Sequence, residues 1–384
     1  MRDGKRQRLF PRKPDFHRLS RRDFLRLVSF TAASAWVARC QTQTPVSPDP
    51  TATTLATTAG TVHLDRVAIS RADTYDRGLV RQQIEAMLNG LGGLRDIVRP
   101  GARVVIKTNL TSGNHFKAPD GLKSTECYAT HPEVVRAVGE LARDAGASQV
   151  YIVEAVYDQE SYSQWGYVDI AKDLNAILID LNLPAPDVDF AIAPVGAGWL
   201  VYESFMFNRI LEQADTFISI AKMKCHWNCG VTLSMKNLIG LVPVTRYRQS
   251  PDHWWRCVLH GSDNDSLRLP RIILDLNRAR PIHLAVIDGI MAAEGGEVPR
   301  GTFKPVQPSV LLAGKNPVAT DAVATAVMSF DPTVGPPTPP FLRDANYLNM
   351  ATELGMGTNR LEQIKVMGAR IDEVRYKFNP AWKN

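Results

Sequence analysis

Residues 215–243 read DTFISIAKMKCHWNCGVTLSMKNLIGLVP, and the other segments are arranged around this stretch. It opens with an apolar, β-branched run at 217–221, which predicts a short buried strand. Cations, thiols and an imidazole follow directly, together with a Lys-Asn pair and two glycines: Lys222, Lys224, Cys225, His226, Cys229, Gly230, Lys236, Asn237 and Gly240. Because open α/β sheets place ligands beyond the carboxyl ends of their strands, this cluster predicts a functional site. The alternative is a basic, solvated loop with two ordinary core cysteines.

The segments on either side alternate between continuous apolar runs and amphipathic repeats. The apolar runs predict strands at 67–70, 103–106, 150–153, 177–181, 283–287, 309–313 and 364–366. The repeats of period 3.6 predict helices at 80–91, 133–145, 267–278 and 317–327. This alternation is typical of an α/β protein with a mostly parallel sheet and helices on both faces, the open doubly wound type.

Polar or charged side chains follow several of the predicted strands. Those that follow the carboxyl end of a strand are Lys107, Asn109, Glu154, Lys222, Lys224, His226 and Asp288. In a parallel sheet these ends share one edge, so we expect the side chains to converge there. No hydrolase elbow, zincin helix or dinucleotide-binding fingerprint is present in the sequence, which argues against those reaction classes.

The spacing of the central motifs carries a family resemblance. Residues 222–226 read Lys-x-Lys-x-His, and residues 232–240 read Thr-x-x-x-Lys-Asn-x-x-Gly. Further motifs occur in order: Lys107-Thr108-Asn109, Thr130-His131-Pro132, Leu259-His260-Gly261, Asp288-Gly289, and Asn316-Pro317 with Asp321. The ordered set resembles the domain-of-unknown-function family 362 over residues 67–368. The resemblance implies a fold and candidate residues rather than a reaction.

The first functional hypothesis is an enzyme, metal-assisted or not, that acts on a small anionic substrate. Lysines would bind carboxylate or phosphate, and His226 would be a general base or a metal ligand, with Asp288 or Glu154 as its partner. The predicted catalytic residues are His226, Lys224, Lys236 and Asp288. The predicted substrate-binding residues are Lys107, Asn109, Lys222, Asn237 and His260.

Two other functions remain open at this point. One is a redox or electron-transfer component with a metal or iron–sulfur centre, and some relatives in the resembled family carry iron–sulfur modules. The predicted metal ligands are Cys225, His226 and Cys229, since residues four apart share a helix face. Plain core packing and disulfides are the alternatives for the cysteines at 127, 225, 229 and 257. The other function is non-catalytic binding of an anion.

Two residues have two interpretations each, and two segments have one feature of note. His131 is either a functional imidazole or a helix cap, and Asp321 is either a site carboxylate or a partner of a helix dipole. Residues 244–266, with the pair Trp254 and Trp255, form a long polar segment that we expect to cover the site. The Gly-rich turn at 294–301 lacks the spacing of a phosphate-binding loop.

The excess of basic residues that gives the chain its net charge of +6 lies in the first forty residues. Residues 1–40 hold eleven Lys or Arg and three Asp, a charge of +8, so the remainder carries +6 − 8 = −2. The basic composition therefore gives no case for nucleic-acid binding.

The N-terminal segment predicts export. The run Ser20-Arg21-Arg22-Asp23-Phe24-Leu25 resembles a twin-arginine signal, and the apolar run that follows at 27–38 is too short to span a bilayer. The alternative is an amphipathic helix that contains Arg-Arg. We expect a leader at 1–40, a disordered linker at 41–61 and a single α/β domain, of one lobe or two, at 62–384. The expected partner is the twin-arginine translocase, the expected location is extracytoplasmic or periplasmic, and Cys40 is a candidate lipid anchor.

Overall fold

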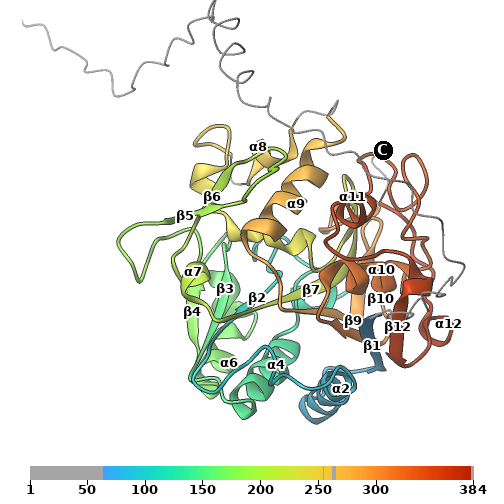
Figure 1. Ribbon diagram of the computed structural model, residues 1–384, viewed down its shortest axis with the longest axis horizontal. Coiled ribbons are helices and arrows are strands. Elements are labelled where there is room, and N and C mark those ends of the chain that lie inside the picture. The colour runs from blue at the N-terminus through green and yellow to red at the C-terminus, as the bar shows by residue number, and fades with distance from the viewer. Residues whose placement is uncertain (1–63, 254, 262–264, 382–384) are drawn as a thin grey trace, which may run out of the picture. The chain divides into compact units, whose positions relative to one another are not determined.

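Ten strands form one sheet in the part of the chain that the computed structural model describes, residues 64–253, 255–261 and 265–381 (Figure 1). Their order is β12-β1-β11-β9-β7-β2-β3-β4, with β10 beside β9 and β8 beside β7. The bounds are β1 Asp65–Arg71, β2 Arg103–Lys107, β3 Gln149–Glu154, β4 Ile177–Asp180, β7 Thr216–His226, β8 Gly230–Thr232, β9 Leu284–Glu294, β10 Lys304–Val306, β11 Val310–Gly314 and β12 Ile364–Gly368. The predicted leader and linker lie outside the described residues.

The main path of the sheet is mostly parallel, as predicted. Only β11 runs antiparallel to its neighbours β1 and β9, and every other neighbouring pair on the path is parallel. A separate two-stranded sheet pairs β5 (Ala191–Pro194) with β6 (Ser204–Phe207).

Helices cover both faces of the sheet, which confirms the predicted fold class. On one face lie α2 (Arg77–Gly90), α4 (Pro132–Asp144) and α6 (Tyr167–Asp173), and their apolar residues share a core with Val104, Ile106 and Ile218. On the other face lie α9 (Arg268–Ala279), α10 (Pro317–Val327) and α11 (Tyr347–Glu353), which pack against Val105, Phe217 and Leu312. Alternate residues of each strand thus supply the two layers of the core.

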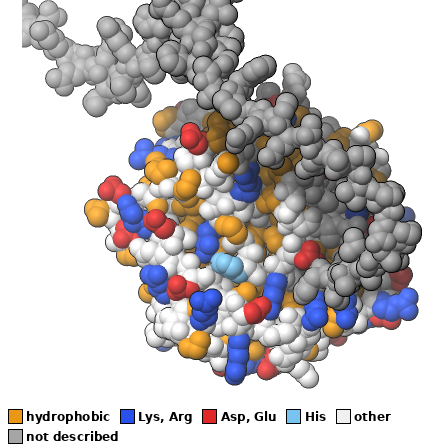
Figure 2. Space-filling model, viewed as in Figure 1, with side chains coloured by type: hydrophobic (Ala, Val, Ile, Leu, Met, Phe, Trp, Pro, Cys, Tyr) orange, Lys and Arg blue, Asp and Glu red, His pale blue; other side chains and the backbone are white. Residues whose placement is uncertain are grey.

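Short helices connect these layers. They are α3 (Ser124–Cys127), α5 (Glu160–Gln164), α7 (Ile210–Gln213), α8 (Cys257–His260), α12 (Ile371–Val374) and the 3₁₀ helices η1 (Lys236–Leu241), η2 (Val244–Arg246) and η3 (Leu361–Gln363). Among the described residues, none of the helices is both long and apolar enough to cross a membrane. On the face drawn in Figure 2, Lys and Arg side chains are interspersed with Asp and Glu.

The central strand is longer than predicted. β7 extends from Thr216 to His226, and all eleven of its residues are buried, so Lys222 and Lys224 lie within the strand rather than beyond it. Asp288 likewise lies inside β9, directly opposite Lys222. The prediction ended the strand at the first lysine because isolated charges are costly to bury. For Lys222 this cost is offset because the lysine pairs with Asp288 on the neighbouring strand.

The two cysteines of the central stretch do not share a helix face. Cys225 lies on β7, and Cys229 lies in the turn that joins β7 to the short antiparallel strand β8. The prediction of a helical turn there was wrong because it used spacing alone. The residues between the cysteines form a tight hairpin, with Cys225 opposite Val231 and His226 opposite Gly230.

Candidate functional site

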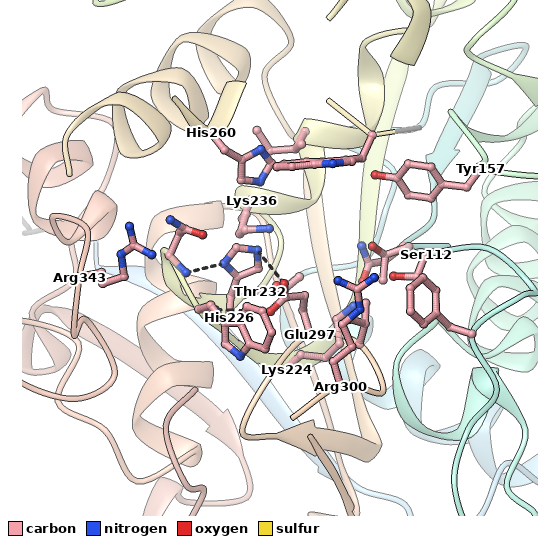
Figure 3. A pocket seen from close by; sticks show the side chains of 18 of the residues that line it. Ser112, Tyr157, Lys224, His226, Thr232, Lys236, His260, Glu297, Arg300 and Arg343 are labelled. Carbon is pink, nitrogen blue, oxygen red and sulfur yellow. Dashed lines mark hydrogen bonds and ion pairs between the residues drawn. The ribbon is translucent and has the colours of Figure 1, made fainter. Parts of the chain in front are cut away.

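A cavity of about 430 Å³ lies beyond the carboxyl ends of four neighbouring strands, β9, β7, β2 and β3 (Figure 3). The segment after β2 contributes Asn109 to Phe116, β7 and its hairpin contribute 224–232, and the turn after β9 contributes 297–300. Tyr157 follows β3, while Lys236, Trp255, His260 and Arg343 close the remaining sides. The location is the ligand-binding edge of open α/β sheets.

Four cationic side chains and one carboxylate line this cavity: Lys224, Lys236, Arg300, Arg343 and Glu297. The Lys224 ammonium donates to the carbonyl oxygen of Tyr128 at 2.7 Å. Within the described residues Lys236 has neither a hydrogen bond nor an ion pair, although it is only 8 % exposed. Burial lowers the pKa of both lysines, and for Lys224 the charge of Lys236 adds to this effect.

The two histidines of the cavity hold opposite tautomers. Nδ1 of His226 accepts from the backbone amides of Asn228 and Cys229 at 3.1 and 3.3 Å, so the proton of the neutral ring is on Nε2. His226 Nε2 lies 3.9 Å from Glu297 Oε1. Nδ1 of His260 lies 3.2 Å from the carbonyl oxygen of Arg256, to which it can only donate, so its Nε2 has a free lone pair.

These tautomers change the role that we predicted for His226. Burial lowers its pKa well below the usual value, helped by the charges of Lys236 and Lys224, so the ring is neutral. A neutral ring with its proton on Nε2 is a hydrogen-bond donor and has no lone pair available for a base. His260 is the better candidate for a proton acceptor. The ring centroids of the two histidines are 6.4 Å apart, so both can reach one small ligand.

The neutral state of His260 predicts a loss of stability in acid. Burial and the charge of Lys236 lower its pKa to about 4, whereas the unfolded side chain titrates near 6.5. Between these values the unfolded state binds the proton and the folded state does not, so stability is lost as the pH falls. Between pH 7 and 5 this histidine accounts for about 2 kcal/mol. Urea titrations of wild type and His260→Gln check this, since the variant should lose about 2 kcal/mol less; equal losses would contradict it.

Two buried polar atoms at the cavity lack a hydrogen-bond partner among the described residues. They are Oδ1 of Asn109, a side chain fixed through its amide nitrogen to Asn237 Oδ1 at 3.1 Å, and Oγ1 of Thr232. Buried polar groups are normally paired, and unpaired ones are concentrated where a ligand or water is bound. Asn109 and Thr232 therefore mark the wall where a polar ligand would be recognised.

Two predicted site residues, Lys222 and Asp288, form a buried ion pair instead. Their charged atoms are 2.7 Å apart, and neither side chain is exposed. Lys222 also donates to Tyr75 Oη and to the carbonyl oxygens of Thr125 and Met291, while Asp288 accepts from Tyr75 Oη and the amide of His131. Neither residue lines the cavity. This pair fastens β7 to β9 and to the start of α4.

His131 belongs to the same buried cluster. Its Nδ1 accepts from the amide of Glu133 at 3.2 Å, which caps α4, and its ring stacks on Tyr75 at 3.7 Å. Burial lowers its pKa to about 3, so the ring is neutral and free to accept this bond. Of its two interpretations, the structure supports the helix cap.

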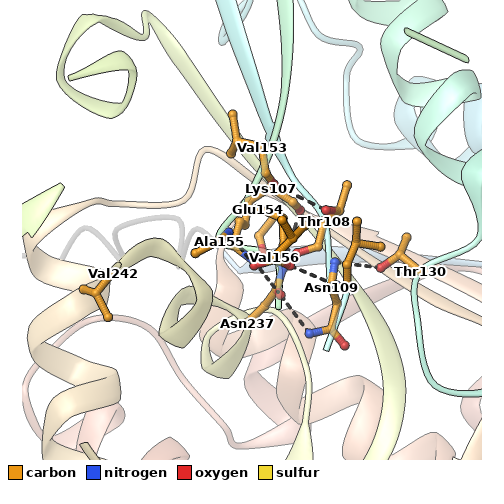
Figure 4. Close-up of polar contacts among 12 residues, drawn as sticks. Lys107, Thr108, Asn109, Thr130, Val153, Glu154, Ala155, Val156, Asn237 and Val242 are labelled. Atoms are coloured by element: carbon orange, nitrogen blue, oxygen red, sulfur yellow. Dashed lines mark hydrogen bonds and ion pairs between the residues drawn. The ribbon is translucent and has the colours of Figure 1, made fainter. Parts of the chain in front are cut away.

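A second buried pair joins Lys107 to Glu154 at 2.8 Å (Figure 4). The Glu154 carboxylate also accepts from the amides of Leu110 and Ala155, and Lys107 donates to Asn237 Oδ1 at 3.3 Å. Asn237 in turn donates to Ser219 Oγ at 3.0 Å. Lys107 and Asn237 therefore position Asn109 and η1 and do not line the 430 Å³ cavity.

Asp321 supports the loop before η1 from the opposite side. Its carboxylate accepts from the amides of Ser234 and Met235 and from the Ser234 hydroxyl. Burial raises its pKa to about 7, and it is fully enclosed. Asp321 thus holds the turn that presents Lys236 to the cavity, and it lies beyond the first turn of α10, the turn in which a partner of the helix dipole would be expected.

The predicted metal ligands are not brought together. Cys225 and His226 are consecutive on a strand, so their side chains leave opposite faces, and the Cys225 thiol lies 3.2 Å from the carbonyl oxygen of Asn379. Both Cys225 and Cys229 belong to the hydrophobic core, where burial raises their pKa. In the described ranges no three His, Cys, Asp or Glu residues are arranged to hold a metal, and the four cysteines there are free thiols.

Several residues of the cavity wall were not predicted from the sequence. Glu297 and Arg300 lie in the Gly-rich turn at 294–301, which we set aside because it lacked phosphate-loop spacing. Its place after a long strand was the signal that could have found it. Arg343 and Tyr157 had no signal in the sequence. The expected cover is present in part, since Trp255, His260 and Gly261 close one side of the cavity; Trp254 lies outside the described residues.

The sheet order and the cation-lined cavity define an open α/β protein with a site at the carboxyl edge of its strands. The family model described as domain of unknown function (DUF362) matches residues 104–326, so the chain belongs to this family. A thylakoid-associated protein of Synechocystis sp. is 28 % identical over 275 residues, which cover 70 % of this chain and 76 % of that protein.

Two solved structures resemble the chain distantly. A protein from Thermotoga maritima has a TM-score of 0.38 and is 14 % identical, and the match covers 68 % of this chain. The lactate racemase apoprotein from Thermoanaerobacterium thermosaccharolyticum has a TM-score of 0.37 and is 11 % identical, and the match covers 63 % of this chain. The chain spans 61 % and 54 % of those two proteins, respectively. Likeness at this level carries no information about the site.

Proposed function

We propose that this protein is an enzyme that binds a small anionic substrate in the cavity beyond β7. The proposal rests on the lining of the cavity, which contains four Lys or Arg side chains and one carboxylate. A volume of about 430 Å³ is in the range of small-molecule sites. Cations collected in an enclosed space attract anions strongly, because the surrounding protein screens charge less than water does.

Each cavity residue has a role in this proposal. Arg300 and Arg343 bind carboxylate or phosphate groups, for which the planar guanidinium is suited, and Arg300 is held in place over the Phe116 ring at 5.0 Å. Lys224 adds a third donor. His226 donates a hydrogen bond through Nε2 to an oxygen that gains negative charge, and His260 accepts a proton at Nε2.

Thermal melts with a panel of carboxylates and phosphates test the proposal. At least one anion should raise the melting temperature of the wild type, since a ligand at one hundred times its Kd adds about 2.7 kcal/mol. Arg300→Met should lose most of this stabilisation because it removes a cation from the wall. Arg99→Met, at an exposed position outside the cavity, should keep it. Failure of every anion to stabilise the wild type would overturn the proposal.

Turnover separates an enzyme from a binding protein. An anion that stabilises the wild type should be converted to a product detectable by NMR, and the rate should fall at least tenfold in His260→Gln, as is typical of losing a proton-transfer group. Binding without conversion of any stabilising anion would favour the non-catalytic alternative.

We also propose that the chain is exported by the twin-arginine translocase. The support is the sequence Ser-Arg-Arg-Asp-Phe-Leu at 20–25 before an apolar run. The double substitution Arg21→Lys and Arg22→Lys should leave the protein in the cytoplasm, as measured by cell fractionation. The control is the same pair of substitutions at Arg6 and Arg8, which lie outside the motif. Unchanged export of the Arg21/Arg22 variant would contradict this proposal.

A further inference from the structure

Lys236 differs from the other buried lysines near the cavity because none of the described residues binds its ammonium group. Lys107 and Lys222 each pair with a carboxylate, and Lys224 donates to a carbonyl oxygen. Lys236 is 8 % exposed and, within the described part of the chain, has no hydrogen-bond acceptor and no ion-pair partner. A buried ammonium without acceptors is costly, so the unliganded side chain gives up its proton more readily than an exposed lysine does.

Burial is what lowers the pKa of Lys236, and the Glu297 carboxylate, more distant than ion-pair range, opposes this shift only in part. Lys236 has Lys224 as its cationic neighbour. His226 and His260 are neutral and lie on either side of it, and Figure 3 shows its side chain extending toward the space between them. A lysine desolvated next to another cation is an activated nucleophile.

We propose that Lys236 forms an iminium with a carbonyl group of the bound anion, so that the substrate is a carbonyl-bearing acid such as a 2-oxo acid. This inference rests on the proposed function and names the substrate class of the same cavity. The carboxylate of such a ligand would bind Arg300, Arg343 and Lys224, and its carbonyl carbon would face Nζ of Lys236. Among the described residues Oδ1 of Asn109 and Oγ1 of Thr232 have no partner; the Thr232 hydroxyl can donate to a ligand oxygen, and Asn109 Oδ1 can accept from a ligand hydroxyl.

The side chains present are those that iminium formation requires. Nζ of Lys236 adds to the carbonyl carbon, and the electron pair of the C=O bond moves to oxygen, which receives a hydrogen bond from Nε2–H of His226. Nε2 of His260 takes a proton from the nitrogen and passes it to the oxygen, which leaves as water after it has gained a second proton from solvent. The balance is amine plus carbonyl plus one proton giving iminium plus water, so no oxidant or reductant is needed.

Reductive trapping tests the inference on the full-length protein. The wild type is incubated with pyruvate or 2-oxoglutarate and sodium borohydride, which converts an iminium into a stable secondary amine. The intact mass should rise by the mass of the oxo acid less one oxygen atom, and peptide mapping should place the label on Lys236. Because the wild type itself reports the labelled residue, the result does not depend on the folding of a variant.

Two variants provide controls. Lys236→Arg keeps a cation in place but cannot form the iminium, so its labelling should fall at least tenfold. Lys365→Arg replaces an exposed lysine on β12 and should leave the labelling of Lys236 unchanged. Label spread equally over exposed lysines, or undiminished in Lys236→Arg, would overturn the inference.

The two proposals fail in different ways. If an oxo acid raises the melting temperature of the wild type and yet labels no Lys236, the inference is overturned and the anion-binding cavity stands. If no anion of any class stabilises the wild type, the proposed function fails and the inference fails with it. A melting shift with pyruvate or 2-oxoglutarate together with a Lys236 adduct supports both.

Discussion

Replacing Lys222 with methionine is expected to reduce the free energy of unfolding by about 3–5 kcal/mol, because it leaves a buried carboxylate without its cation. The Asp288 oxygen lies 2.7 Å from the lysine nitrogen, and both side chains are fully enclosed. The hydrogen bonds of Lys222 to the carbonyl oxygens of Thr125 and Met291 are lost as well. Urea denaturation of the purified variant in the absence of ligand measures the effect.

Lys236→Met is the matched control. The same residue type is replaced by the same apolar side chain at a site that is also buried, but no partner is left behind among the described residues. We expect its stability to lie within about 1 kcal/mol of the wild type or above it, since burying a charge costs free energy. Equal losses of unfolding free energy in the two variants would show that Lys222 stabilises the fold only by filling space. That result would contradict a stabilising ion pair with Asp288.

Gly240→Ala is expected to destabilise the protein by about 3 kcal/mol or more, the scale of breaking a buried ion pair. A Cβ at this position would lie 2.6 Å from Nζ of Lys107 and closer still to Oε1 of Glu154. Both ends are fixed, since the carboxylate also accepts from the amides of Leu110 and Ala155. The glycine of the Lys-Asn-x-x-Gly motif is therefore needed for the close approach of η1 to this pair.

Gly90→Ala serves as the control for this glycine. It lies in the last turn of α2, where an added Cβ would meet only Met367 at an ordinary 3.9 Å. Alanine has the higher helix propensity, so we expect a gain of up to about 1 kcal/mol. A fully stable Gly240→Ala protein with the Lys107–Glu154 pair intact in a crystal structure would disprove the proposed steric role.

The fold class could be read from the sequence because it depends on local patterns. Apolar runs at 103–106 and 150–153 and the amphipathic repeat at 133–145 each specify one element, and their alternation restricts the sheet to a mostly parallel order. The motifs after the strands also located the carboxyl edge, and Lys224, His226, Lys236, Asn109 and His260 from the predicted set do line the cavity there.

The roles of the individual charged residues were decided only by the tertiary structure. Lys222 and Lys224 are two residues apart on β7, yet one faces Asp288 across the sheet and the other faces the cavity, since the register of β7 and β9 shifts between them. The predicted strand ended too early because sequence alone did not reveal the carboxylate from residue 288 that makes burial of Lys222 tolerable. Hydrophobic periodicity is a property of neighbours in the chain, whereas the pairing of buried charges depends on residues brought together from distant segments. The sequence thus determined the sheet and the edge that holds the site, and the fold determined which cations pair inside the sheet and which line the cavity.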